Sequence, residues 1–140
     1  MERDCNKMEL RKLTYPSLYR HFKGDTYCVR FTSKPTYIKW IDQTYEKGRD
    51  ACFLVHHTEL NRKIIIYRID GHWFHEADIE VEELVIYNCV NNPAKDEVYA
   101  RPLKMFLSKV DKEKYPNCKQ EYRFDKREVI IESVGTSIDE

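Results

Sequence analysis

Short runs of aromatic and β-branched residues, separated by polar turns, recur along most of the chain. Such runs favour β-strands, because these side chains pack well on a pleated surface. The first run, residues 19–24, ends in Lys-Gly and is followed by Asp25, and Gly24 can take the positive φ that a tight reversal requires. The pattern predicts an opening β-hairpin whose second strand places Tyr27, Val29 and Phe31 on one face.

Later runs predict the rest of a sheet. Residues 51–55 and 63–69 are rich in Val, Ile, Leu, Phe and Tyr and form a second hairpin, after which Asp70-Gly71 turns the chain and residues 72–74 extend the sheet. Further strands are expected at residues 84–89 and 98–101, with shorter ones at 108–110 and 122–124.

Two segments carry a helical pattern instead. Residues 32–35, Thr-Ser-Lys-Pro, read as a turn, and the apolar residues after them recur at helical spacing, which predicts a short helix over 36–47. Residues 103–107 predict one more helical turn. We therefore expect a mainly β protein, a small SH3-like open barrel with one inserted short helix and an extra hairpin.

The same pattern suggests a domain organisation. Residues 1–16 are expected to be an N-terminal arm, 17–124 a single β-barrel domain with an insertion at about 32–80, and 125–140 a C-terminal tail.

Composition narrows the function classes only a little. Lys and Arg together number 24 and so do Asp and Glu, so the net charge of zero neither demands a polyanionic partner nor excludes one. No apolar run is long enough to span a bilayer and the first residues lack a secretory signal, so we expect a cytoplasmic protein with no membrane partner. The five cysteines are scattered without a Cys-x-x-Cys pair, which predicts reduced thiols and no metal or other cofactor.

Three stretches carry a family resemblance. Tyr-Arg-His-Phe-Lys-Gly at 19–24, Glu-Leu-Val-Ile-Tyr at 83–87 and Arg-Pro-Leu-Lys-Met-Phe at 101–106, with Arg-Phe at 123–124, resemble a bacterial family called domain of unknown function 1653. The resemblance covers about half of the chain and implies a small open barrel similar to the SH3 type, with no activity to carry over. The long interval between Val29 and Leu84 departs from the family, and this insertion is where a specialised function could have been added.

Basic residues of the opening hairpin are the first candidates for ligand contact. Arg20, His21 and Lys23 lie within four positions, and Arg101 joins them if the last strand pairs beside this hairpin. Arginine offers a planar fork that matches phosphate or carboxylate, and histidine donates or accepts near neutral pH. The alternative is that these charges are solvated or pair with nearby carboxylates, as surface charges usually do.

Aromatic rings are the second candidates. Trp73, Tyr87 and Tyr99 could stack on a nucleobase beside an arginine, although rings in apolar strands more often belong to the core.

Histidines 56, 57, 72 and 75 gather near predicted strand ends, but their spacing is a weak metal pattern. We expect them to face solvent.

These features predict a binding module for an anionic, base-bearing ligand: a nucleotide, a nucleotide signal or a short nucleic acid. A more specific version is a phage-type protein that sequesters a nucleotide signal and self-associates. The alternatives are a protein–protein interaction module or a small enzyme acting on nucleotides. The enzyme is less favoured, because the sequence has no nucleophile motif and no glycine-rich phosphate loop.

Overall fold

A computed structural model of the chain describes residues 11–37 and 49–127. Within these residues, strands and one short helix follow in this order: β1 (Ser17–His21), β2 (Thr26–Thr36), β3 (Arg49–His57), β4 (Arg62–Ile69), β5 (His72–Glu76), β6 (Leu84–Cys89), β7 (Val98–Pro102), α3 (Leu103–Phe106) and β8 (Phe124–Arg127). No helix in the described part of the chain is long and apolar enough to cross a membrane.

All the described strands belong to one sheet, in the order β5-β4-β3-β7-β6-β2-β1-β8. The sheet closes on itself because the end of β2, at Lys34, Pro35 and Thr36, also pairs in parallel with β5. Strands β2, β6, β7, β3, β4 and β5 therefore form a closed barrel, which confirms the mainly β barrel predicted from the sequence. Three of these strands, β3 to β5, come from the segment expected to be an insertion.

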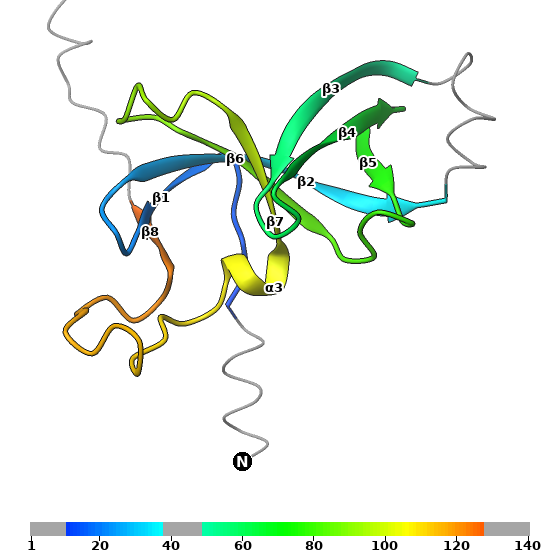
Figure 1. Cartoon of the computed structure of the whole chain (residues 1–140). Coiled ribbons are helices and arrows are strands. Elements are labelled where there is room, and N and C mark those ends of the chain that lie inside the picture. The colour runs from blue at the N-terminus through cyan, green and yellow to red at the C-terminus, as the bar shows by residue number, and fades with distance from the viewer. Residues whose placement is uncertain (1–10, 38–48, 128–140) are drawn as a thin grey trace, which may run out of the picture.

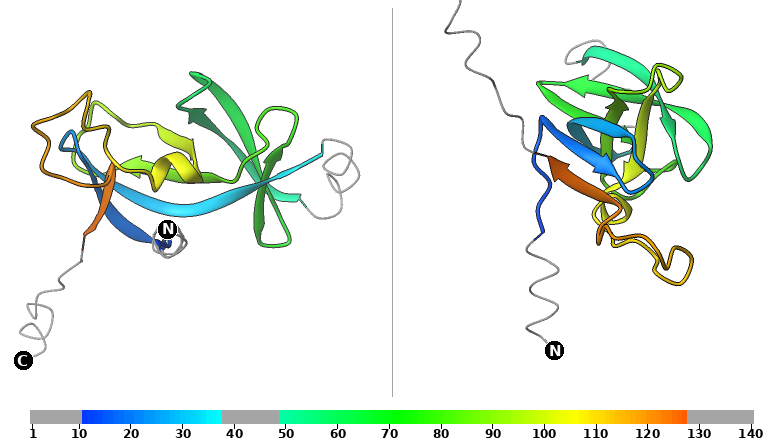
Figure 2. Two further views of the ribbon diagram at one scale, coloured as in Figure 1. Left: turned by 90° about the horizontal axis from the view of Figure 1, so that it is seen from below. Right: turned by 90° about the vertical axis from the view of Figure 1, so that its left-hand side faces the viewer.

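Strand β2 connects the barrel to a second part of the molecule. Its first half pairs with β1, and β1 pairs in turn with β8 (Figure 1). Figure 2 shows β2 running along the length of the molecule, with the barrel at one end and β1, β8 and the loop after α3 at the other. The 11 residues of β2 thus serve two neighbouring units of structure.

The core is correspondingly divided by β6, whose first three residues are fully buried. On one side of β6, Val85 and Tyr87 pack with residues of β1, β2, α3 and β8: Tyr19, Tyr27, Val29, Phe106 and Phe124. On the other side, Leu84 and Ile86 fill the barrel with residues of β3, β4 and β7: Val55, Ile64, Ile66 and Ala100. An unbroken apolar run, Leu-Val-Ile-Tyr, is what a strand buried on both faces requires.

Several local predictions are confirmed. The opening hairpin turns at Gly24, whose φ is +117°, and the second hairpin is β3–β4. Asp70 and Gly71 make the next turn with φ of 54° and 82°. The helical turn after Pro102 is α3.

The turn predicted at residues 32–35 is wrong, because these residues continue β2. Pro35 is tolerated there since it lies beyond Ser33, the last residue of β2 that pairs with β6, so its missing N–H interrupts no pairing on that edge. The helix predicted over 36–47 falls mostly on residues 38–48, outside the described residues, as do most of the predicted arm and tail.

The expectation that the histidines face solvent is wrong for two of them. His57 and His75 are fully buried and share one hydrogen-bond network. Nε2 of His57 lies 2.7 Å from Oε1 of Glu80, while His75 bonds Oγ of Ser33 at 2.7 Å and the Glu80 carbonyl at 3.1 Å. The network ties β2, β3 and β5 to the acidic loop, which explains the cluster. Among the residues that the structure describes, no group of His, Cys, Asp or Glu could hold a metal ion.

The double burial of β6 predicts a large cost for truncating it. Replacing Ile86 by Ala should lower the free energy of unfolding by about 2 to 5 kcal/mol, because the side chain is fully buried in the barrel core. Replacing Leu54, which is 56% exposed, by Ala should change it by less than about 0.5 kcal/mol. Urea denaturation of both variants measures the difference; equal costs would contradict this assignment of the core.

Candidate anion-binding pocket

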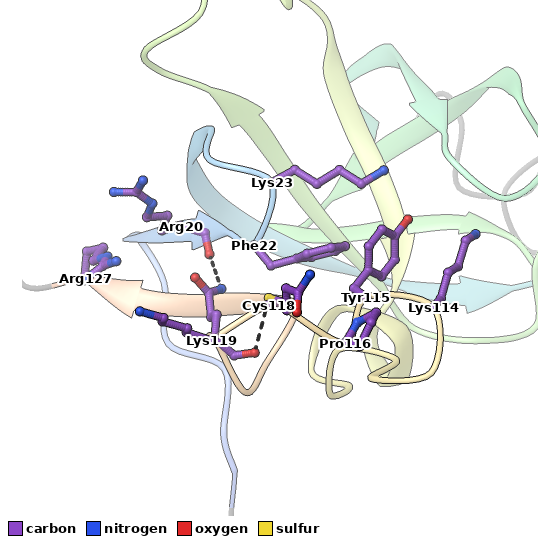
Figure 3. Close-up of a pocket in the computed structure, with 11 residues that line it drawn as sticks. Arg20, Phe22, Lys23, Lys114, Tyr115, Pro116, Cys118, Lys119 and Arg127 are labelled. Carbon is purple, nitrogen blue, oxygen red and sulfur yellow. Dashed lines mark hydrogen bonds between the residues drawn. The ribbon is translucent and has the colours of Figure 1, made fainter.

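A cavity of about 670 Å³ lies at the end of the molecule where β1 and β8 pair, between the opening hairpin and the loop after α3 (Figure 3). Its lining combines two segments distant in sequence with the end of β8: Arg20, Phe22, Lys23, Lys114, Tyr115, Pro116, Asn117, Cys118, Lys119, Gln120 and Arg127.

The charge of this lining is entirely positive. Five of the lining residues are Arg or Lys, and none of the described residues that line it is Asp or Glu. Asp125 lies opposite Arg20 in the β1–β8 register, but the ion pairs found among the described residues do not join the two side chains. On a chain with no net charge, such local segregation creates a positive field that attracts anions.

Two aromatic rings complete the pocket. The rings of Phe22 and Tyr115 meet edge to face, with centroids 4.9 Å apart. Nζ of Lys23 lies 5.6 Å from the Tyr115 centroid and 5.8 Å from the Phe22 centroid. A cation beside two half-exposed rings suits a ligand that carries both negative charge and a flat ring.

The loop that supplies half of the pocket is held by its own hydrogen bonds. The side chain of Asp111 accepts from the amides of Glu113 and Lys114, and Lys112 donates to the Gln120 carbonyl at 3.0 Å. The side-chain amide of Gln120 donates a hydrogen bond to the backbone carbonyl of Arg20 at 2.9 Å, which fixes the loop against β1. These bonds fix the backbone of the loop that carries Lys114 and Lys119. A loop ordered in this way would lose less entropy on contact with a ligand.

The four basic residues predicted from sequence to form one anion site do not all lie together in the structure. Successive residues of a strand point to opposite faces, so Arg20 points outward into the pocket while His21 points inward. The His21 ring contacts the Phe124 ring at 4.8 Å, and the guanidinium of Arg101 lies 5.5 Å from the same ring. Arg20 and Lys23 therefore line the pocket, whereas His21 and Arg101 lie behind it.

The predicted rings lie away from the pocket. Tyr87 is a core residue whose hydroxyl accepts from Nε of Arg101 at 3.1 Å, and burial raises the pKa of this phenol to about 12 despite the opposing effect of Arg101. Tyr99 packs against it with centroids 5.8 Å apart. Trp73 stacks on Phe31 at 4.4 Å beside the barrel core.

The pKa of His21 reflects its burial and the positive charges around it. Burial and then the positive charges of Arg101, Lys23, Lys95 and Arg123 lower the pKa of this imidazole to about 4. Its Nδ1 accepts a hydrogen bond from the Lys23 amide at 3.2 Å, so the neutral ring supports the hairpin turn.

The sequence prediction missed the second half of the pocket: Lys114, Tyr115, Lys119 and Arg127. The signal that could have found it is a local concentration of charge, four lysines and a tyrosine within residues 109–119. Read alone, that segment is a polar loop. It lines the pocket because it lies against β1.

One family model matches part of the chain. Residues 74–126 match the family model of a protein of unknown function, DUF1653. The predicted resemblance is thereby confirmed for these residues, which include β6, β7, α3 and the loop of the pocket. The matched segment supplies residues 114–120 of the pocket, while Arg20, Phe22 and Lys23 come from outside the match. No curated protein and no solved structure matches the chain.

The lowered pKa of His21 predicts a dependence of stability on pH. The unfolded chain takes up a proton on this imidazole below its ordinary pKa of 6.5, but the folded protein does so only near 4. Stability should therefore fall as the pH drops from 6.5 to 4 and lose nothing further from this group below that. His75, whose pKa burial also lowers, adds a loss in the same direction.

The variant His21→Gln removes one of these two contributions. Its thermal midpoint should fall less than that of the wild type over this pH range, as measured by circular dichroism. Parallel curves for the two proteins would show that His21 titrates normally in the folded state.

Proposed function

We propose that this protein is a cytoplasmic, non-catalytic binding module for an anionic, base-bearing ligand such as a nucleotide, a nucleotide signal or a short nucleic acid. The observation that carries the proposal is the pocket lining: five cationic side chains, no carboxylate among the described lining residues, and two aromatic rings.

Each part of the lining has a matching part in such a ligand. Arg20 and Arg127 offer guanidinium forks that suit phosphate oxygens, and the lysines add point charges. Tyr115 and Phe22 offer ring edges and faces for a base. A lining of this kind can bind the negative charge of a phosphate and stack against a base, which supports binding without requiring a chemical step.

Titration of a mononucleotide, followed by calorimetry, tests the proposal. The double variant Lys23→Ala, Lys114→Ala should lose at least about tenfold in affinity, because each lysine supplies a charge-assisted contact. The double variant Lys34→Ala, Lys63→Ala is the matched control: it removes the same charge from exposed positions outside the pocket and should bind as the wild type does.

The nucleoside without phosphate should bind more weakly than the nucleotide. Equal affinity of the two double variants would contradict the proposal.

A second candidate function, protein–protein interaction or self-association, rests on one observation. Leu54 and Ile65 lie directly opposite each other on β3 and β4, and both are well exposed, at 56% and 40%. An apolar pair on the outer face of a barrel can contact an apolar surface of another chain.

Salt separates the two candidates. Binding of a phosphate-bearing ligand should weaken as salt rises from about 0.05 to about 0.2 M, whereas an apolar contact should hold or tighten. Sedimentation velocity over this range, with Leu54→Lys as the disrupting variant, measures self-association. A monomer at all salt concentrations would remove this surface as a contact between copies.

A further inference from the structure

We propose that the occupant of the pocket is single-stranded nucleic acid, an oligonucleotide whose backbone runs along the pocket from Arg20 and Arg127 to Lys23 and Lys114. This inference rests on the proposed function and makes its ligand class specific.

The cations fall into two groups. Figure 3 shows Arg20, Arg127 and Lys119 at one end of the pocket and Lys23 and Lys114 at the other. Phe22 and Pro116 lie between the groups. A single phosphate would contact one group and leave the other without an anion, whereas successive phosphates of one strand can reach both.

The shape of the cavity also favours a strand. It is a groove open to solvent, although its volume of about 670 Å³ is within the range of small-molecule sites. Sites for small ligands usually enclose about 70 to 90% of the ligand surface. Proteins that bind single strands instead use open, positively charged grooves with aromatic side chains on which bases stack.

One group that could read a base, the side-chain amide of Gln120, is engaged within the protein. The Gln120 amide donates to the Arg20 carbonyl at 2.9 Å and to the Tyr122 carbonyl at 2.8 Å. The rings of Phe22 and Tyr115 accept any base, because every base has a π-face. Binding should therefore tolerate different sequences.

A length series tests the inference. Thymidine monophosphate and oligothymidylates of about four and about eight nucleotides are titrated into the full chain by calorimetry at several salt concentrations. The affinity should rise with length. The slope of log K against log salt should become steeper, towards about −3.5 if all five cations meet phosphates at about −0.7 each.

Single substitutions show which residues contribute to the dependence of binding on salt. Arg20→Ala and Lys114→Ala, one from each end, should each make the slope of the longest oligonucleotide shallower by about 0.7, whereas Lys63→Ala should leave it unchanged. Tyr115→Leu should lower the affinity about tenfold while keeping the slope, because stacking carries no counterion release. The thermal midpoint of each variant checks that the fold persists.

The outcomes separate this inference from the proposed function. If the mononucleotide binds as tightly as the longest oligonucleotide, with the same salt slope, the proposal of an oligonucleotide ligand is wrong, while the proposal of a nucleotide-binding pocket is retained. Duplex DNA that binds as well as the single strand would also overturn the inference, because stacking on Tyr115 needs an unpaired base. If neither mononucleotide nor oligonucleotide binds, both proposals fail.

Discussion

The burial of β6 on both faces is the constraint on which the rest of the molecule depends. Leu84 and Ile86 complete the barrel core on one side, while Val85 and Tyr87 hold β1, β8 and α3 on the other. A strand without a solvent face needs partners on both edges, which β2 and β7 provide. Because β2 is long enough to leave the barrel, the same strand that closes the ring also carries β1 into place.

The pocket is a consequence of that arrangement. Once Tyr19 is fixed in the core, alternation along β1 directs Arg20 to the outside, beside the end of β8. The loop after α3 then crosses this face and is fastened to β1 through Gln120. Core packing thus places basic side chains from two distant segments around one groove without an intervening carboxylate among the described lining residues.

The features that follow from local pattern could be predicted from the sequence. The hairpin turn at Gly24, the apolar run of β6 and the helical turn after Pro102 each carry their own signal within a few residues. What could not be predicted depends on pairing between distant segments. Closure of the barrel rests on the parallel contact of Pro35 with His75, and a Thr-Ser-Lys-Pro segment read alone indicates a turn.

The candidate site shows the same division. The concentration of charge in the hairpin indicates Arg20 and Lys23, and both line the pocket. The sequence also groups Arg101 with them, but Arg101 does not line the pocket, because strand order alone does not say which face a side chain occupies. Lys114 and Lys119, which also line the pocket, could not be predicted, since a polar loop gives no sign of the surface against which it folds.

Nuclear magnetic resonance tests most directly whether the groove between β1 and the loop after α3 is the binding site. Two-dimensional amide spectra of the isotope-labelled protein are recorded as unlabelled oligothymidylate is added. The amide chemical shifts should change most at residues 20–23 and 114–120 and at Arg127. The changes should remain small around the exposed pair Leu54 and Ile65. Shifts centred on that pair, or no shifts at all, would contradict the account.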